Sequence, residues 1–268
     1  MEKNDICQLM HTLLPKLYSF AYALGPDEVF AEQLIIDAYT LMIMKDEDIF
    51  LSEDYDLKNV YDRKILKKYL FKEMLSEMYE LAMKREKPNW EHVSFEYQSF
   101  YQLKPSQRAL IFLKEKCELL IEDLQEVFTL QRFQVLENYH NAKSFLLSHD
   151  QQEKSLEDEN MTLQNSAETS RDFLVRAYVN KTIKLKDIPL VEKMIGEDNQ
   201  LQALYTALIE EQNFLQDLVL EKKCIAENIK NIHHIMEEVT VDILPETKKS
   251  LVKRISEFLD KPILTIDY

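Results

Sequence analysis

Glycine occurs only twice among the 268 residues, at Gly25 and Gly196. β-Sandwiches, barrels, phosphate-binding loops and dinucleotide folds need glycine where the backbone takes a positive φ or approaches a phosphate closely. The straight-chain helix formers Leu, Glu, Lys, Gln and Met fill long stretches of the chain instead. The sequence therefore predicts an all-α fold, and its length predicts at least two domains.

Apolar residues recur with the i, i+3, i+4, i+7 spacing of a helix in several segments. The stripe over residues 29–42 follows a proline and two acids, which are typical of a helix start. Further stripes cover residues 71–82, 201–219 and 245–259, and the last seven residues, PILTIDY, favour an extended tail.

Two segments interrupt this pattern. Residues 88–102 contain a proline and five aromatic side chains, with no Lys or Arg between Trp90 and Tyr101. An aromatic platform for nucleic acid interleaves basic residues, so we favour a hydrophobic linker packed over a core. Residues 148–170 are rich in Gln, Glu, Asp, Ser and Asn and have little to bury, which is typical of a polar linker.

The formal net charge is −15. Proteins that bind nucleic acid on their own draw most of their affinity from Lys and Arg on phosphates, so this chain is better suited to basic protein partners. The three cysteines, Cys7, Cys117 and Cys224, are irregularly spaced and form no CxxC pair, which favours reduced thiols. No secretory leader or membrane-length apolar run is present, and we expect a cytoplasmic protein.

Side chains that carry catalysis or bind metals do not gather in the sequence. His233 and His234 are adjacent, so on a helix they point about 100° apart, and we expect one buried and one exposed histidine. No His or Cys spacing fits a zinc site, and no Ser or Cys lies in a loop context that would expose a nucleophile. We therefore expect neither an enzyme nor a bound cofactor or metal.

Two stretches near the amino terminus resemble extracytoplasmic-function sigma factors of bacteria. Residues 17–24 (LYSFAYAL) are similar to the opening helix of that family, and residues 31–39 (AEQLIIDAY) to its helix that docks on the RNA polymerase clamp. Gln33 stands where the family has an acid, and Ile36 where it has glutamine. The resemblance implies that a partner-binding face lies on Glu32, Leu34, Asp37 and Tyr39.

A longer stretch, residues 103–147, resembles the promoter-reading helix-turn-helix domain of the same family without a gap. The LxPxQR opening and the apolar core positions are present, but the turn glycine is Thr129 and the DNA-facing positions are poor in Lys and Arg. The resemblance implies a degenerate reader with weak or indirect DNA binding. The candidate DNA contacts are Arg132, Gln134, Asn138 and Lys143.

Residues 171–220 resemble the helical head of cytoplasmic anti-sigma domains, through the LVRAYV segment and the later helix over residues 201–218. The His-x3-Cys-x2-Cys set of many anti-sigma domains is absent, so the resemblance implies a zinc-free domain.

The expected layout follows from these segments: a sigma-like helical domain over 1–87, an aromatic linker over 88–102, a degenerate helix-turn-helix over 103–149, a polar linker over 150–170 and an anti-sigma-like domain over 171–268. The expected function is transcription regulation through contacts with the RNA polymerase core or a regulatory protein, with self-inhibition by the carboxy-terminal domain. The alternative is a sigma-shaped scaffold or decoy that binds neither polymerase nor DNA.

Overall fold

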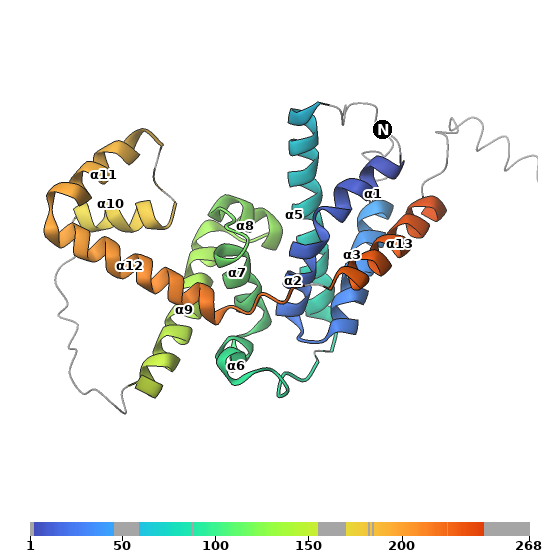
Figure 1. The fold of residues 1–268 in the computed structure, drawn as a ribbon, viewed down its shortest axis with the longest axis horizontal. Helices are drawn as coiled ribbons and strands as arrows, with labels where there is room; N and C mark the ends of the chain where they lie inside the picture. The colour runs from blue at the N-terminus through green and yellow to red at the C-terminus, as the bar shows by residue number, and fades with distance from the viewer. Residues whose placement is uncertain are drawn as a thin grey trace, which may run out of the picture.

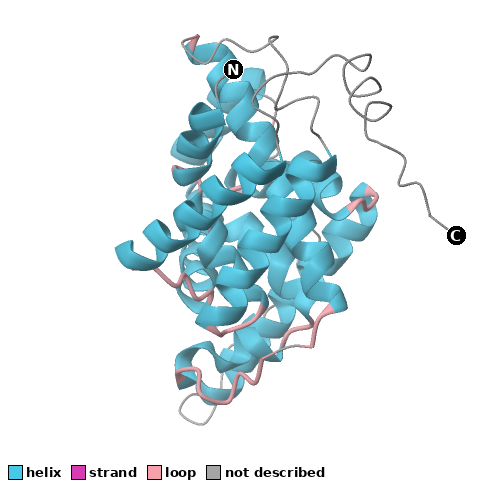
Figure 2. Cartoon of the chain, turned by 90° about the vertical axis from the view of Figure 1, so that its right-hand side faces the viewer, coloured by secondary structure: helices cyan, strands magenta, loops and turns pink. Residues whose placement is uncertain are grey.

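The apolar stripe predicted over residues 29–42 lies on α3 (Glu28–Lys45) in a computed structural model. The structure describes residues 3–45, 59–86, 88–154, 170–223 and 225–243, apart from 182 and 184. Within these residues every regular element is a helix, which confirms the all-α prediction (Figures 1 and 2). The stripes predicted over 71–82 and 201–219 lie on α5 (Val60–Lys84) and α12 (Asn199–Leu218).

Four amino-terminal helices, α1 (Lys3–His11), α2 (Leu14–Leu24), α3 and α5, pack around a common core. The side chain of Asp27 accepts a hydrogen bond from the backbone N–H of Phe30 at 2.7 Å. Asn59 does the same for Tyr61 at 2.9 Å. These bonds satisfy amides that have no partner inside the first turn, and so fix where α3 and α5 begin.

The segment with the helix-turn-helix resemblance forms α7 (Pro105–Glu115), α8 (Ile121–Phe128) and α9 (Arg132–Lys154). Thr129 ends α8 in the left-handed conformation, with φ 52° and ψ 41°. The family resemblance expects glycine at this position, and glycine adopts that conformation without the steric cost that a Cβ brings. The turn geometry is therefore retained here by a β-branched residue.

The predicted aromatic linker contains a helix of its own, α6 (Phe95–Gln102), and joins the helix-turn-helix to the amino-terminal helices. Phe100 and Tyr101 of α6 are fully buried, and the Tyr101 hydroxyl donates to the carbonyl of Tyr22 at 2.9 Å. The guanidinium of Arg108 donates to the carbonyls of Tyr101 and Leu24 at 2.7 and 2.9 Å. As a result, buried side chains of the helices from α1 to α9 belong to one continuous apolar core.

The chain after residue 170 divides between two cores. The helices α10 (Ser170–Val179) and α11 (Ile188–Glu197), a short 3-10 turn (Leu185–Asp187) and the first half of α12 form a small bundle, called the head here. Its buried core consists of five side chains: Val175, Val179, Val191, Leu201 and Leu208. The second half of α12 instead packs on α6, α7 and α9, where Leu215 joins the main core.

Beyond α12 the chain crosses to the opposite side of the molecule and forms α13 (Ala226–Ile243), which lies against α1 and α3 (Figure 1). Ile232 and Met236 of α13 are buried in the main core. The described part of the predicted 171–268 domain thus has one core of its own and also contributes to the core of the domains before it. Helix α9 runs to Lys154, into the predicted polar linker. The rest of that linker, the helix predicted over 245–259 and the tail lie outside the described residues.

Candidate functional site

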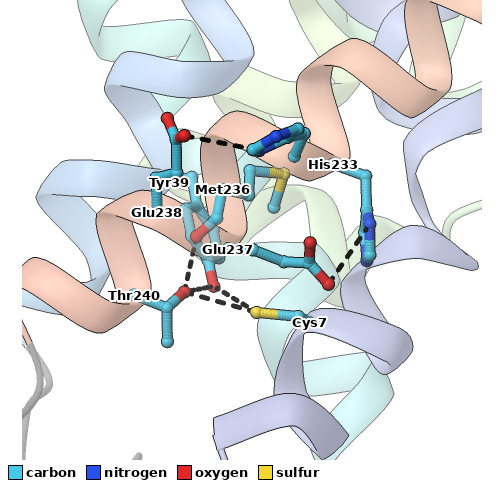
Figure 3. Close-up of polar contacts among 8 residues, drawn as sticks. Cys7, Tyr39, His233, Met236, Glu237, Glu238 and Thr240 are labelled. Atoms are coloured by element: carbon cyan, nitrogen blue, oxygen red, sulfur yellow. Dashed lines mark hydrogen bonds and ion pairs between the residues drawn. The ribbon is translucent and has the colours of Figure 1, made fainter.

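The contact between α13 and the amino-terminal helices contains a buried polar cluster (Figure 3). Tyr39 of α3 and Thr240 of α13 lie with their oxygens 2.7 Å apart, and the Cys7 sulfur of α1 lies 3.3 Å from the Thr240 oxygen. The Thr240 hydroxyl donates to the carbonyl of Met236 at 2.6 Å, so it accepts from Tyr39 and Cys7. Burial, with a smaller contribution from Cys7, raises the pKa of the Tyr39 phenol, which therefore stays protonated as a donor.

Polar contacts extend along the same face of α3. Glu28 forms an ion pair with Lys222 at 3.0 Å, and Glu32, one turn further on, receives a hydrogen bond from Asn228. Burial and the neighbouring Glu28 raise the pKa of Glu32, whereas the hydrogen bond from Asn228 opposes that shift. Lys222 belongs to the connection between α12 and α13, and its carbonyl accepts from Ser19 of α2 at 2.8 Å. The connection is therefore fixed to α2 and α3 before α13 begins.

Two histidines complete the contact. The rings of His11 on α1 and His233 on α13 meet edge to face, with centroids 4.8 Å apart. The Nδ1 atom of His233 lies 3.7 Å from Glu237, and its Nε2 atom is buried without a hydrogen-bond partner. His234 points outward, with 72% of its side chain exposed against 20% for His233. The expectation was one buried and one exposed histidine; His234 is exposed, whereas His233 is only partly buried. We call Cys7, His11, Glu32 and Tyr39 the α13 seat.

The four predicted partner-binding residues have different environments. Leu34 and Tyr39 are fully buried, Leu34 in the helix core and Tyr39 beneath α13. Glu32 is half-buried at the edge of α13. Asp37 pairs with Arg85, the residue that follows α5, and accepts from Gln33 at 2.8 Å. Of this set, Glu32 and Tyr39 are thus brought together under α13.

Sequence reasoning missed Cys7, His11 and Thr240. A signal for them was present in the spacing, because Ile232, Met236 and Thr240 recur every four residues and so share one face of a helix. Thr240 places a hydroxyl at the third position of that apolar stripe. A hydroxyl there predicts a buried polar partner, but the pattern does not say which residue supplies it.

The candidate DNA contacts on α9 are engaged within the chain. Arg132 pairs with Glu122 of α8, and Lys143 pairs with Glu211 of α12. Asn138 donates to the carbonyl of Gln134 at 2.9 Å, and the Gln134 side chain accepts from the amide of Gln131 at 2.9 Å. Each charged candidate therefore faces a carboxylate, the group that most closely resembles a phosphate among side chains.

Side chains of the metal-ligating kind are scattered in the part of the chain that the structure describes. No group of three or more His, Cys, Asp or Glu side chains there could hold a metal ion. Burial raises the pKa of the Cys117 thiol to about 12, so the nucleophilic thiolate is scarce at neutral pH. Among the same residues, no helix is both long enough and apolar enough to cross a bilayer.

Comparisons with family models, with curated proteins and with solved structures give no match. The sigma-factor and anti-sigma resemblances accordingly stay predictions from the quoted residues.

Proposed function

We propose that the chain is a non-enzymatic transcription regulator that resembles an extracytoplasmic-function sigma factor and inhibits itself by keeping α13 on its own α3. One observation carries the proposal. Tyr39, a predicted partner-binding residue, has no exposed surface, and its hydroxyl lies 2.7 Å from Thr240 of α13. Of the four residues that the resemblance assigns to the polymerase clamp, Glu32 and Tyr39 are covered by the carboxy-terminal region.

The energetics of the α13 contact support this proposal. Ile232, Met236 and Thr240 are each at most 1% exposed, so an incoming partner must displace a side of α13 that is fully withdrawn from water. Burying one large apolar side chain contributes about 1.5–3 kcal/mol. The connection from α12 is short and fixed by Lys222, which gives α13 a high effective concentration at its seat. A partner of moderate affinity would bind only after α13 has been released.

The charge distribution supports protein contacts more than DNA contacts. Arg132 and Lys143 are paired with Glu122 and Glu211, and the exposed Glu137 lies on the same helix. Useful affinity for DNA requires several phosphate contacts, and each of these pairs would have to break first. This observation also favours the alternative, a sigma-shaped scaffold or decoy that binds neither polymerase nor DNA.

The test compares two substitutions on opposite sides of α13. Met236→Asp places a charge in the buried contact, whereas Val241→Asp places the same charge on a residue that is 61% exposed. An unpaired buried carboxylate is strongly unfavourable, so Met236→Asp should release α13. We expect Met236→Asp to bind purified bacterial RNA polymerase core at least about tenfold more tightly than the wild type, a shift of about 1.4 kcal/mol. Val241→Asp should bind like the wild type.

Circular dichroism must first show that both variants keep their helix content. Equal polymerase affinity of Met236→Asp and the wild type would refute self-inhibition. If neither protein binds the polymerase core at all, the scaffold or decoy function replaces the proposal.

A further inference from the structure

The head contains a cavity of about 450 Å³ between α10, the turn that follows it and α12. We propose that this cavity binds a small amphipathic anion, with an aromatic or branched apolar body and one carboxylate. The site lies away from the α13 seat, and the inference does not depend on the proposed polymerase partner.

The walls of the cavity are suited to the apolar body of such a ligand. Tyr178 and Tyr205 present two rings with centroids 6.0 Å apart, and Ile183, Ile188 and Ile209 extend the apolar lining beside Val179. The side chains of these two tyrosines and three isoleucines are only partly buried. Ligand sites typically measure about 300–1,000 Å³ and combine apolar and aromatic walls with a few polar groups. A ligand here would remove from water the apolar surface that the head leaves partly exposed.

The positive charge in the cavity lining favours an anionic ligand. Lys181 is the one charged residue among the described residues that line it. It lies in the turn after α10 with φ 56°, and its Nζ is 3.0 Å from the carboxylate of Glu118. A carboxylate on the ligand can replace Glu118 at Lys181, whereas an ammonium group would meet Lys181 with the wrong sign. The Tyr178 hydroxyl already donates to Glu192 at 3.0 Å, so Lys181, together with the Gln212 side chain, is left to orient the ligand.

Competition for Lys181 links the cavity to the helix-turn-helix. Glu118 follows α7, so its ion pair with Lys181 is one of the contacts between the head and that domain. The Glu118 side chain is 63% exposed and can turn into solvent when the ligand arrives. A second contact, from the Lys114 Nζ to the carbonyl of Asn180 at 3.3 Å, does not involve Lys181. Ligand binding therefore weakens the attachment of the head without requiring the head to detach.

Calorimetric titration of the full chain with three probes of one shape tests the proposal: 4-phenylbutyrate, 4-phenylbutan-1-ol and 4-phenylbutylammonium. We expect only the butyrate to bind with a dissociation constant below about 1 mM. Lys181→Gln should weaken binding of the butyrate by about fivefold, which corresponds to the upper range for a partly exposed ion pair. Glu118→Gln should tighten binding of the butyrate by about two- to threefold, because the competing carboxylate is removed. Lys186→Gln, on an exposed lysine that does not line the cavity, is the matched control and should change nothing.

A fourth variant, Ile209→Trp, fills the cavity and should abolish binding while the circular dichroism spectrum stays unchanged. The opposite effects of Lys181→Gln and Glu118→Gln would support the site. Absence of binding by the butyrate, equal binding of the alcohol, or undiminished binding to a folded Ile209→Trp would each overturn it.

Discussion

Thr240→Val is the sharpest test of the α13 contact, because it removes one hydroxyl and keeps the branched shape. The Thr240 oxygen accepts from Tyr39 at 2.7 Å and from Cys7 at 3.3 Å. Without it, the nearest alternative partner of the Tyr39 hydroxyl is the Cys7 sulfur at 3.8 Å. Leaving a buried donor without an acceptor costs about 1–3 kcal/mol. We expect Thr240→Val to lower the free energy of unfolding by about 2 kcal/mol.

Tyr39→Phe, which changes the other partner in this hydrogen bond, should lower the free energy of unfolding by less. Thr240 still donates to the carbonyl of Met236, so no buried donor is orphaned and only one net hydrogen bond is lost, worth about 1 kcal/mol. In the double variant neither hydroxyl remains, and replacing both partners by apolar groups is nearly neutral relative to replacing one. The two substitutions should therefore couple by about 1–2 kcal/mol.

Urea unfolding of the wild type, both single variants and the double variant, followed by circular dichroism, measures this coupling. Thr206→Val is the matched control, since the exposed Thr206 hydroxyl donates only to the carbonyl of Gln202 in its own helix. It should change stability by less than about 0.5 kcal/mol. Additive effects of Thr240→Val and Tyr39→Phe would refute the bond between α3 and α13.

Further predictions concern the glycines, the buried arginine and alkaline pH. A Cβ at Gly25 would lie 2.7 Å from a ring carbon of Phe30, whereas a Cβ at Gly196 meets nothing within 4 Å. Thermal melts should therefore show that Gly25→Ala destabilises the protein by about 1–3 kcal/mol and that Gly196→Ala stabilises it by up to about 1 kcal/mol. Arg108→Met leaves the buried carbonyls of Tyr101 and Leu24 without their donor and should lower the free energy of unfolding in urea by about 2–4 kcal/mol. Burial lowers the pKa of Arg108 to about 10, which reduces the contribution of its charge to stability. Burial raises the pKa of the Tyr39, Tyr101 and Tyr139 phenols above the ordinary value near 10, so the unfolded chain loses these protons first and stability should fall as pH rises above about 10. The tyrosinate absorbance of these three residues should appear only on unfolding.

Local apolar patterns predicted three of the described helices, α3, α5 and α12. The stripe and the proline-acid start located α3, whose first turn is capped by Asp27, and glycine scarcity predicted the fold class. The segment 88–102 was harder. Its aromatic side chains follow no clean helical period, and α6 owes its place to the burial of Phe100 and Tyr101 against α2 and α7. Tertiary contacts rather than local preference decide the structure of such a segment.

The candidate site was predictable only in part, because its contacts join distant positions. The Cys7 and Thr240 partners are separated by 233 residues, and Tyr39 and Thr240 by 201. An amphipathic pattern shows that a helix has a face to bury, but the same pattern fits many possible partners. The resemblance singled out Glu32 and Tyr39 of α3, and α13 covers both. Self-inhibition by the carboxy-terminal domain was expected, but no pattern singled out α13 as the part of that domain that lies on α3.

The carboxy-terminal region is held with very different strength at its two ends, and this difference orders its release. The head meets the helix-turn-helix through the exposed Lys181–Glu118 pair and a hydrogen bond from Lys114 to the carbonyl of Asn180. Contacts of these kinds contribute about 0–1.5 kcal/mol each. Leu215, Ile232 and Met236 are at most 1% exposed in the main core, and each such side chain contributes about 1.5–3 kcal/mol. Local opening follows the weakest contacts first, so the head separates more readily than α13 does. A signal that acts on the head alone would therefore leave Tyr39 covered, and exposure of the α3 face requires a partner or signal that competes directly for the α13 seat.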